Sequence, residues 1–430
     1  MSRQNKLMLC GIAVVATAMF STAYTQAQTP SPAPAAPAAP AAAPAAPGST
    51  PGAPAAAPAA PAAAPVAPPA PFDTALLNAA NTLFSKALLP AGNDKVDLVI
   101  DPLIDGISGA QSAASHLMEK RLAELADKSY PRFKVQQFTT AVIDRAPVVL
   151  VGTFTAINNA GEANGARDAF RICLALADLR SRTIISKGFA KALPTGVDVT
   201  PTPYFADNPI WTEDPSTTAY IKTCQGTKPG DPINPLYIER IGTASLISDG
   251  ISEYDNKRYR EALAFYRTAM RMPGGDQLRV RNGVYLANWK LGRRDDADQS
   301  FGDLVSFGLK TSKLAVRFLF KPGSTQFFGD EQITSPYPMW IKQIASRTAQ
   351  SSTCLEIVGH TSPTGPSLLN ERLSVLRAQA IKTTLEQTDQ RLNGKLIANG
   401  VGPRENLVGT GKDDTSDALD RRVEFKVLKC

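Results

Sequence analysis

The segment CLEIVGHTSPTGPSLLNERLSVLRA, residues 354–378, decides how the C-terminal part of this chain folds. In its first half apolar and polar residues alternate up to a loop, which predicts a strand that ends at this loop. In its second half the apolar residues have the spacing of a helix. The apolar run at 314–320 predicts an earlier strand, with a helix between the two strands. A last strand should begin at 420–425. Strands and helices are therefore expected to alternate over residues 313–430.

Three short motifs in this region follow one another in a defined order: GHT at 359–361, NxxLSxxRA at 370–378 and DRRVE at 420–424. Together with the strand and turn that precede them, these motifs resemble the signature of the OmpA/Pal/MotB family. The resemblance covers residues 313–430. It implies an OmpA-like βαβαβ(β) domain that associates with peptidoglycan and has no catalytic activity.

In this family the ligand is the diaminopimelate end of the peptidoglycan stem peptide, which carries an ammonium and a carboxylate. The resemblance implies that Arg377 binds the carboxylate, with support from Thr361 and Asn370. A guanidinium suits this role because it can form two parallel hydrogen bonds with a carboxylate. The alternative is that Arg377 is an ion-pair partner inside the domain, which would then serve as a scaffold.

This chain departs from the family directly after the GHT motif, where Ser362 replaces the usual aspartate. The aspartate would pair with the ligand ammonium. A charge-assisted hydrogen bond contributes about 1.5–3 kcal/mol and a neutral one about 1 kcal/mol, so binding could weaken roughly tenfold. Either Ser362 still accepts a hydrogen bond from the ammonium, or the more positive pocket prefers an amidated or purely anionic ligand.

The helix that follows this loop is expected to have two distinct faces. Ser367 should cap it and so direct its free N–H groups towards the loop. The stripe expected to face the core contains Leu369, Leu373, Leu376 and Ala380. The stripe expected to meet the ligand contains Asn370, Ser374 and Arg377.

Two arginines, Arg421 and Arg422, open the last predicted strand. Alternation along a strand sends neighbouring side chains to opposite faces. One arginine is therefore expected beside the ligand loop and the other in solvent, and we assign Arg421 to the peptidoglycan site.

The N-terminus has the layout of a secretory signal over residues 1–27: two positive charges, an apolar run at 7–20, and small residues up to Ala27. The run is short for a membrane span, which needs about 20 residues, so cleavage is favoured over an uncleaved anchor. Residues 28–71 are rich in Ala and Pro and contain no charge, which predicts a disordered linker. The protein is thus expected to be exported to the periplasm.

Four cysteines remain after the predicted cleavage, an even number that suits an oxidising compartment. If each bridge stays within its own domain, the pairs are Cys173–Cys224 and Cys354–Cys430. Zinc is disfavoured because the chain has two histidines and no CxxC motif. The net charge of +7 comes without a Lys/Arg cluster containing aromatic residues, so nucleic acid is an unlikely class of partner.

Residues 72–240 predict an α+β domain. VDLVID at 96–101 predicts a buried strand, and a helix is expected over 110–128. Four more apolar runs between 132 and 192 predict further strands with antiparallel neighbours. Residues 193–234, which include Trp211, are rich in Pro, Thr and Asp and predict a long irregular segment.

Residues 241–310 contain an internal repeat of 35 residues, in which Tyr254, Ala262 and Tyr266 are matched by Trp289, Ala297 and Phe301. The first unit has the spacing of a tetratricopeptide repeat, whose small residues let two helices approach closely. Two units cannot bury a solenoid core alone. The pair is expected to pack on a neighbouring domain as a spacer; a peptide-binding groove is the alternative.

An enzyme is disfavoured. Asp101 and Asp105 are spaced like a metal or acid–base pair, but acidic residues in loops after strands usually form caps and turns. No phosphate-binding lysine motif and no glycine-flanked nucleophilic serine occurs. We expect a non-catalytic envelope protein without cofactor that tethers a protein partner, bound through 72–310, to the wall. The alternative is an accessory subunit of an envelope machine without wall affinity.

Overall fold

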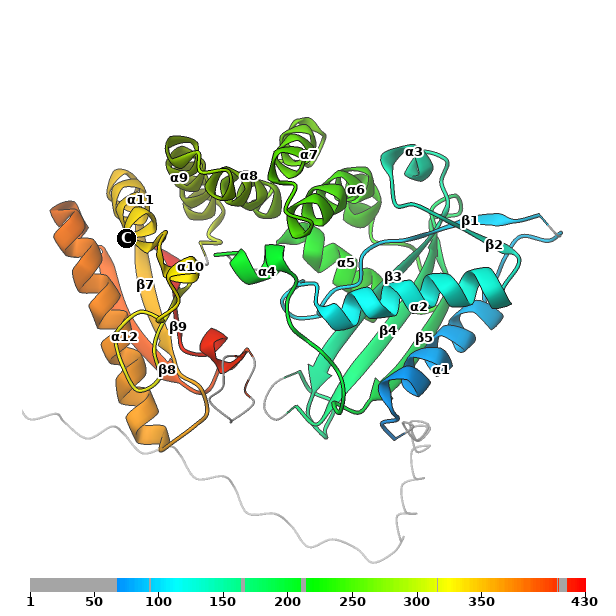
Figure 1. Ribbon diagram of the computed structural model, residues 1–430, viewed down its shortest axis with the longest axis horizontal. Coiled ribbons are helices and arrows are strands. Elements are labelled where there is room, and N and C mark those ends of the chain that lie inside the picture. The colour runs from blue at the N-terminus through cyan, green and yellow to red at the C-terminus, as the bar shows by residue number, and fades with distance from the viewer. Residues whose placement is uncertain are drawn as a thin grey trace, which may run out of the picture. The chain divides into compact units, whose positions relative to one another are not determined.

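A computed structural model describes residues 68–92, 94–163, 167–209, 214–314, 316–407, 409 and 416–430. The predicted signal peptide, most of the predicted linker and Trp211 lie outside these residues. The described part combines helices and strands, which confirms the mixed fold class expected from the sequence (Figure 1).

The first sheet has the strand order β2-β1-β3-β4-β5, with β1 parallel to both neighbours and β3, β4 and β5 antiparallel. Its strands are β1 (Val96–Ile100), β2 (Phe133–Gln136), β3 (Val148–Ile157), β4 (Ala169–Asp178) and β5 (Thr183–Ala192). All five strands were predicted. The parallel pairing of β1 makes the sheet mixed rather than wholly antiparallel.

Helices cover both faces of this sheet, so β3 is buried along its whole length. Helices α1 (Phe72–Ser85) and α2 (Ala113–Ser129) pack on the face that includes Leu150 and Leu174. The opposite face, with Val151 and Cys173, meets α5 (Pro215–Gln225) and the first half of α6 (Pro235–Asp255). Period-2 alternation therefore supplies two separate apolar cores.

The prediction of irregular structure over 193–234 was wrong. This segment contains α4 (Pro203–Asp207) and α5, and Cys224 lies in the last turn of α5. Each helix begins with a proline at its first position, where the missing N–H and the fixed φ cost nothing. A short helix α3 (Thr140–Ile143) precedes β3.

Four helices follow: α6, α7 (Tyr259–Arg271), α8 (Leu278–Lys290) and α9 (Arg294–Thr311). Tyr266 of α7 lies between two glycines, because a Cβ added at Gly250 or Gly283 would come within 2.7 Å and 2.6 Å of its ring. The repeat therefore corresponds to two helical hairpins held together by small residues. Its assignment as tetratricopeptide-like stays a prediction.

The second sheet has the order β6-β9-β7-β8, in which β7 is parallel to β8 and antiparallel to β9. Its strands are β6 (Phe318–Leu319), β7 (Thr353–His360), β8 (Leu396–Gly402) and β9 (Arg422–Lys429). The helices are α10 (Glu331–Thr334), α11 (Tyr337–Gln350) and α12 (Ser367–Thr388), with short 3-10 turns at Gln390–Leu392 and Ser416–Leu419. Helix α12 packs on β7 and β8, and α11 packs on α9.

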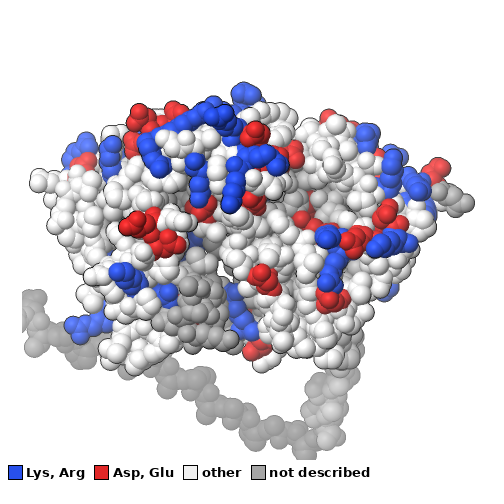
Figure 2. Space-filling model, in the orientation of Figure 1, with Lys and Arg blue, Asp and Glu red and all other residues white. Residues whose placement is uncertain are grey.

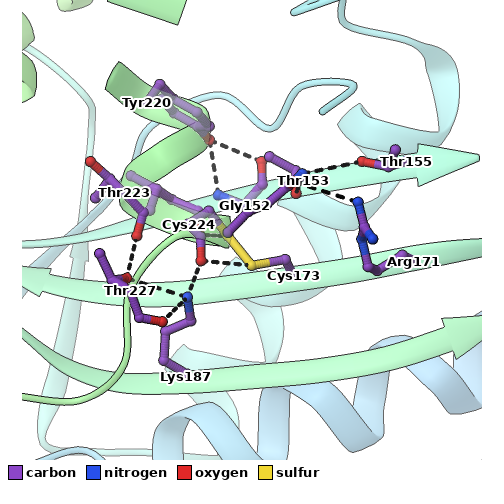
Figure 3. The surroundings of a disulfide bond; sticks show 12 residues. Gly152, Thr153, Thr155, Arg171, Cys173, Lys187, Tyr220, Thr223, Cys224 and Thr227 are labelled. Carbon is purple, nitrogen blue, oxygen red and sulfur yellow. Dashed lines mark hydrogen bonds between the residues drawn. A yellow bond between two sulfur atoms is a disulfide. The ribbon is translucent and has the colours of Figure 1, made fainter. Parts of the chain in front are cut away.

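Both expected disulfides are present. Cys173 of β4 is joined to Cys224, which ties α5 to the first sheet (Figure 3). Cys354 at the start of β7 is joined to Cys430 after β9, as expected for antiparallel neighbours. Among the described residues, no helix has the length and apolar character needed to cross a bilayer.

Candidate functional site

The GHT motif ends strand β7 and leads into a loop at 361–366 that connects to α12. The expected cap at Ser367 was wrong. Pro366 occupies the N-cap position and Ser367 is the first helical residue, without a side-chain cap. Instead, Asn370 steadies the loop by donating from Nδ2 to the carbonyl oxygen of Thr364 at 3.0 Å.

The two faces of α12 are the reverse of those predicted. Asn370, Ser374 and Arg377 are buried, whereas Leu369 and Leu376 are exposed at 61% and 48%. The cause is close packing between α12 and the strands. Gly359 and Gly400 lie directly opposite Ser374, and a Cβ at either glycine would collide with it. Ser374 Oγ accepts a hydrogen bond from Gly402 N at 3.0 Å.

Arg377 is completely buried and its guanidinium contacts main-chain oxygens. Nε donates to Ser324 O at 2.9 Å, Nη2 to Lys321 O at 2.9 Å and Nη1 to His360 O at 3.0 Å. The side chain also lies over the ring of Phe320, 5.3 Å from its centroid. Arg377 therefore holds the turn at 321–324 against the end of β7.

Thr361 has an enclosed hydroxyl for which the described residues provide no partner. Its Oγ1 is buried and has no hydrogen-bond partner among the described residues, although its carbonyl accepts a hydrogen bond from Asn406 Nδ2 at 3.1 Å. Such a group needs an explanation, because native proteins satisfy the great majority of buried polar atoms. Ser362, next in the chain, is also buried.

Neither arginine of the DRRVE motif lies in solvent, so this expectation was wrong. Arg421 precedes β9 and donates from Nε to Phe320 O at 3.3 Å. Arg422 is equally buried; its Nη1 and Nη2 each donate to Glu405 O at 3.2 Å. Alternation does not separate them because Arg421 lies outside the regular strand.

His360 and Glu424 form a pair that the sequence analysis missed, with Nε2 of His360 3.1 Å from Oε1 of Glu424. Burial lowers the pKa of His360. Burial alone would raise the pKa of Glu424, but contacts with His360 and Arg422 hold it well below its usual value. The cue was available, because both residues belong to motifs, GHT and DRRVE, on paired strands.

A metal ion could be held in this region by His360, Glu405 and Glu424, whose ligand atoms lie within 4.8 Å of one another. Arg422 Nε already lies 3.2 Å from Oε2 of Glu424. A positive side chain on the carboxylate disfavours a cation at the same place.

Asp101 and Asp105 do not share a site. Oδ1 of Asp105 accepts hydrogen bonds from Ser108 N and Oγ and from Ile107 N, which is the pattern of a local turn. Asp101 lies at the end of β1, and its Oδ2 accepts a hydrogen bond from Tyr237 at 2.7 Å. The GISGAQS segment ends in a capping box formed by Ser112 and Ser115 of α2.

No protein-family model matches this chain, and a search of curated proteins finds no match. Solved structures that resemble part of it include the peptidoglycan-associated lipoprotein from Burkholderia pseudomallei, with 22% identity over 26% of this chain and 88% of that one, at a TM-score of 0.22. The OmpA-like domain of FopA1 from Francisella tularensis has 20% identity over 27% of this chain and 75% of that one, at a TM-score of 0.20. The periplasmic domain of Helicobacter pylori MotB has 17% identity over 27% of this chain and 75% of that one, at a TM-score of 0.21.

Proposed function

We propose that this chain is an exported, non-catalytic envelope protein whose residues 313–430 form an OmpA-like domain that associates with the peptidoglycan stem peptide. One observation supports this proposal above the others: side chains from three separate motifs meet at the end of β7 and the loop that follows it, residues 360–366. Asn370 and Arg377 bond to main-chain oxygens of Thr364 and His360, and His360 pairs with Glu424 of the third motif.

Thr361 is the residue best placed to contact the ligand, because its enclosed hydroxyl has no partner among the described residues. Ser362 would accept a hydrogen bond from the diaminopimelate ammonium, or would leave the loop better suited to an amidated stem peptide. Arg377 and Arg421 supply positive charge behind the loop. Arg377 is completely buried, so direct contact with the ligand carboxylate would require the loop to move and admit the ligand.

Binding to purified sacculi, measured by co-sedimentation of the full chain, tests this proposal. The wild-type protein should pellet with the sacculi, and Thr361→Val should reduce the bound fraction. Ser362→Asp restores a carboxylate and should tighten binding roughly tenfold. Thr388→Val, at the exposed far end of α12, is the matched control and should leave binding unchanged. Failure of the wild type to pellet, or equal binding by all variants, would contradict the proposal.

A second function is favoured by the complete burial of Arg377: a scaffold domain without wall affinity in an envelope secretion, motility or wall-synthesis machine. Here Arg377 would only hold the turn at 321–324 in place. The same sedimentation assay separates the two, since a scaffold would not pellet with sacculi in any variant.

The partner held against the wall would bind the region 72–310. Helix α7 exposes three arginines, Arg260, Arg267 and Arg271, and Figure 2 shows Lys and Arg gathered over the helical hairpins. A partner with an acidic surface fits this face by charge. Export to the periplasm, proposed from the N-terminal signal, is supported by the two disulfides, which persist in oxidising compartments.

A further inference from the structure

A cavity of about 60 Å³ lies where the end of β1, the first turn of α5, helix α6 and the first turn of α8 meet. Part of the lining is apolar and includes Ile104, Leu236 and Ile251. The lining also carries two arginines, Arg240 of α6 and Arg279 of α8. The cavity therefore combines apolar and cationic groups.

The two arginines are held by hydroxyl groups and not by carboxylates. Nη1 of Arg240 donates to Ser216 Oγ at 2.8 Å, and Nη2 of Arg279 donates to Thr217 Oγ1 at 2.7 Å. In the part of the chain that the structure describes, neither guanidinium lies within 4.0 Å of a carboxylate oxygen. Nε of Arg240 is buried without a hydrogen-bond partner.

The N-terminal end of α8 adds to the positive character of the arginines, because Arg279 belongs to the first turn of this helix. The corresponding end of α5 is already capped by the carboxylate of Asp214, which accepts from Thr217 N at 2.8 Å. Asp101 is the one acidic residue that lines the cavity, and its Oδ2 is already occupied by Tyr237. Burial raises the pKa of Asp101 to about 7, so it neutralises the arginines incompletely.

We propose that this cavity binds a small organic carboxylate with a short apolar body, of the size of acetate to butyrate. The carboxylate lies against Arg240 and Arg279 and accepts hydrogen bonds from their N–H groups, and the alkyl part lies against the isoleucine and leucine side chains. The small volume, about 60 Å³, limits the ligand to a short chain. Both arginines are half-buried, so solvent reaches the polar end.

Titration of the full chain with propionate, followed by isothermal calorimetry or by line broadening of the propionate NMR signals, tests the site. Saturable binding in the millimolar range or tighter is expected, and propionamide, which has the same shape without the charge, should bind at least tenfold more weakly. Arg279→Gln and Arg240→Gln should each weaken propionate binding at least tenfold while circular dichroism shows an intact fold. Arg281→Gln, on the same helix but paired with Asp276, is the matched control and should bind as wild type does.

Three results would overturn the proposal. Equal binding of propionate and propionamide would remove the role of the arginines. Binding of inorganic phosphate without binding of propionate would assign the cavity to a different anion. Absence of saturable binding by either would mean that the cavity holds only ordered water.

Discussion

One substitution at Thr361 should weaken binding to sacculi without lowering the stability of the protein. Its hydroxyl is buried without a hydrogen-bond partner among the described residues. Removing an unsatisfied buried hydroxyl with an isosteric methyl is neutral or stabilising. We therefore expect Thr361→Val to leave the free energy of unfolding unchanged or to raise it by about 1 kcal/mol in urea denaturation, although it weakens sacculus binding.

Thr223→Val is the matched control for stability, because Thr223 is also buried but donates to Ala219 O at 2.8 Å. This variant should lose about 1 kcal/mol. Equal losses at the two positions would show that the hydroxyl of Thr361 has a partner in solution.

Arg377 should behave as a structural residue in the absence of ligand. Arg377→Ala removes three hydrogen bonds to main-chain oxygens and leaves a large void, so a loss of about 3–5 kcal/mol in unfolding free energy is expected. Arg372→Ala, an exposed arginine of the same helix, should change stability by less than about 0.5 kcal/mol. Similar midpoints for the two variants in urea would contradict the role assigned to Arg377.

Asp101 should make the protein less stable as the pH rises. Burial disfavours the charged form and raises the pKa of Asp101 from its ordinary value of 3.8 to about 7 in the folded state. The folded state keeps the proton longer than the unfolded state, so stability is greatest below pH 4 and falls until about pH 7. One pKa unit corresponds to about 1.36 kcal/mol, so the loss of unfolding free energy across this pH range is about 4 kcal/mol.

The variant Asp101→Asn isolates this contribution from that of Glu119, whose pKa is also raised by burial, to about 8. The difference in unfolding free energy between variant and wild type should be small at pH 4 and should reach its full value in favour of the variant at pH 8. A constant difference across this range would mean that Asp101 titrates at its ordinary pKa.

The sequence identified the residues near the loop better than it identified their surroundings. Asn370, Ser374 and Arg377 do share one face of α12, as their spacing predicted. The face turns inward because Gly359 and Gly400 admit the helix closely, and these glycines lie on two strands whose pairing the sequence alone does not give. Polarity suggested exposure for Arg377, whereas its partners are main-chain oxygens that have no sequence signature.

Helix α6 contains two glycines whose replacement should have opposite effects. Around Gly242, a Cβ would meet no atom within 4 Å, so Gly242→Ala should stabilise the protein by roughly 0.5–1 kcal/mol through helix propensity. At Gly250 the Cβ would press on the ring of Tyr266, and overpacking costs about 1–3 kcal/mol. Thermal unfolding followed by circular dichroism measures both. Stabilisation by both variants would show that Tyr266 can move aside.

Elements with a strong hydrophobic period were predictable, whereas α4 and α5 were not. The five strands of the first sheet follow from runs of apolar residues, and β3, buried on both faces, is the clearest of them. The helices α4 and α5 were missed because the Pro, Thr and Asp content of 193–234 predicted irregular structure, although Pro203 and Pro215 each occupy the first position of a helix. Asp214, which caps α5 by accepting from Thr217 N at 2.8 Å, was the signal that could have located that helix.

At the scale of the whole molecule, the helical hairpins and the second sheet share one apolar core, which runs from Tyr204 to Phe425. Phe301 of α9 stacks on Trp340 of α11 with ring centroids 5.5 Å apart, and Trp340 Nε1 donates to Tyr285 at 2.7 Å. The spacing of the repeat indicated only that the helical pair must pack on a neighbour. The structure identifies α11 as one surface that it covers.

This shared core predicts that residues 313–430 are less stable alone than within 235–430. In the shorter fragment the face of α11 that carries Trp340 becomes exposed, and exposing one large aromatic side chain costs about 2–3 kcal/mol. Urea denaturation followed by far-UV circular dichroism should give a lower midpoint for the shorter fragment. Trp340→Ala should narrow the difference between the two midpoints, because it destabilises the longer fragment more. Because the two parts share buried side chains, the longer fragment should unfold in one cooperative transition. Equal midpoints, or two separate transitions in the longer fragment, would instead mean that the C-terminal domain folds independently and that the helical hairpins rest on it without stabilising it.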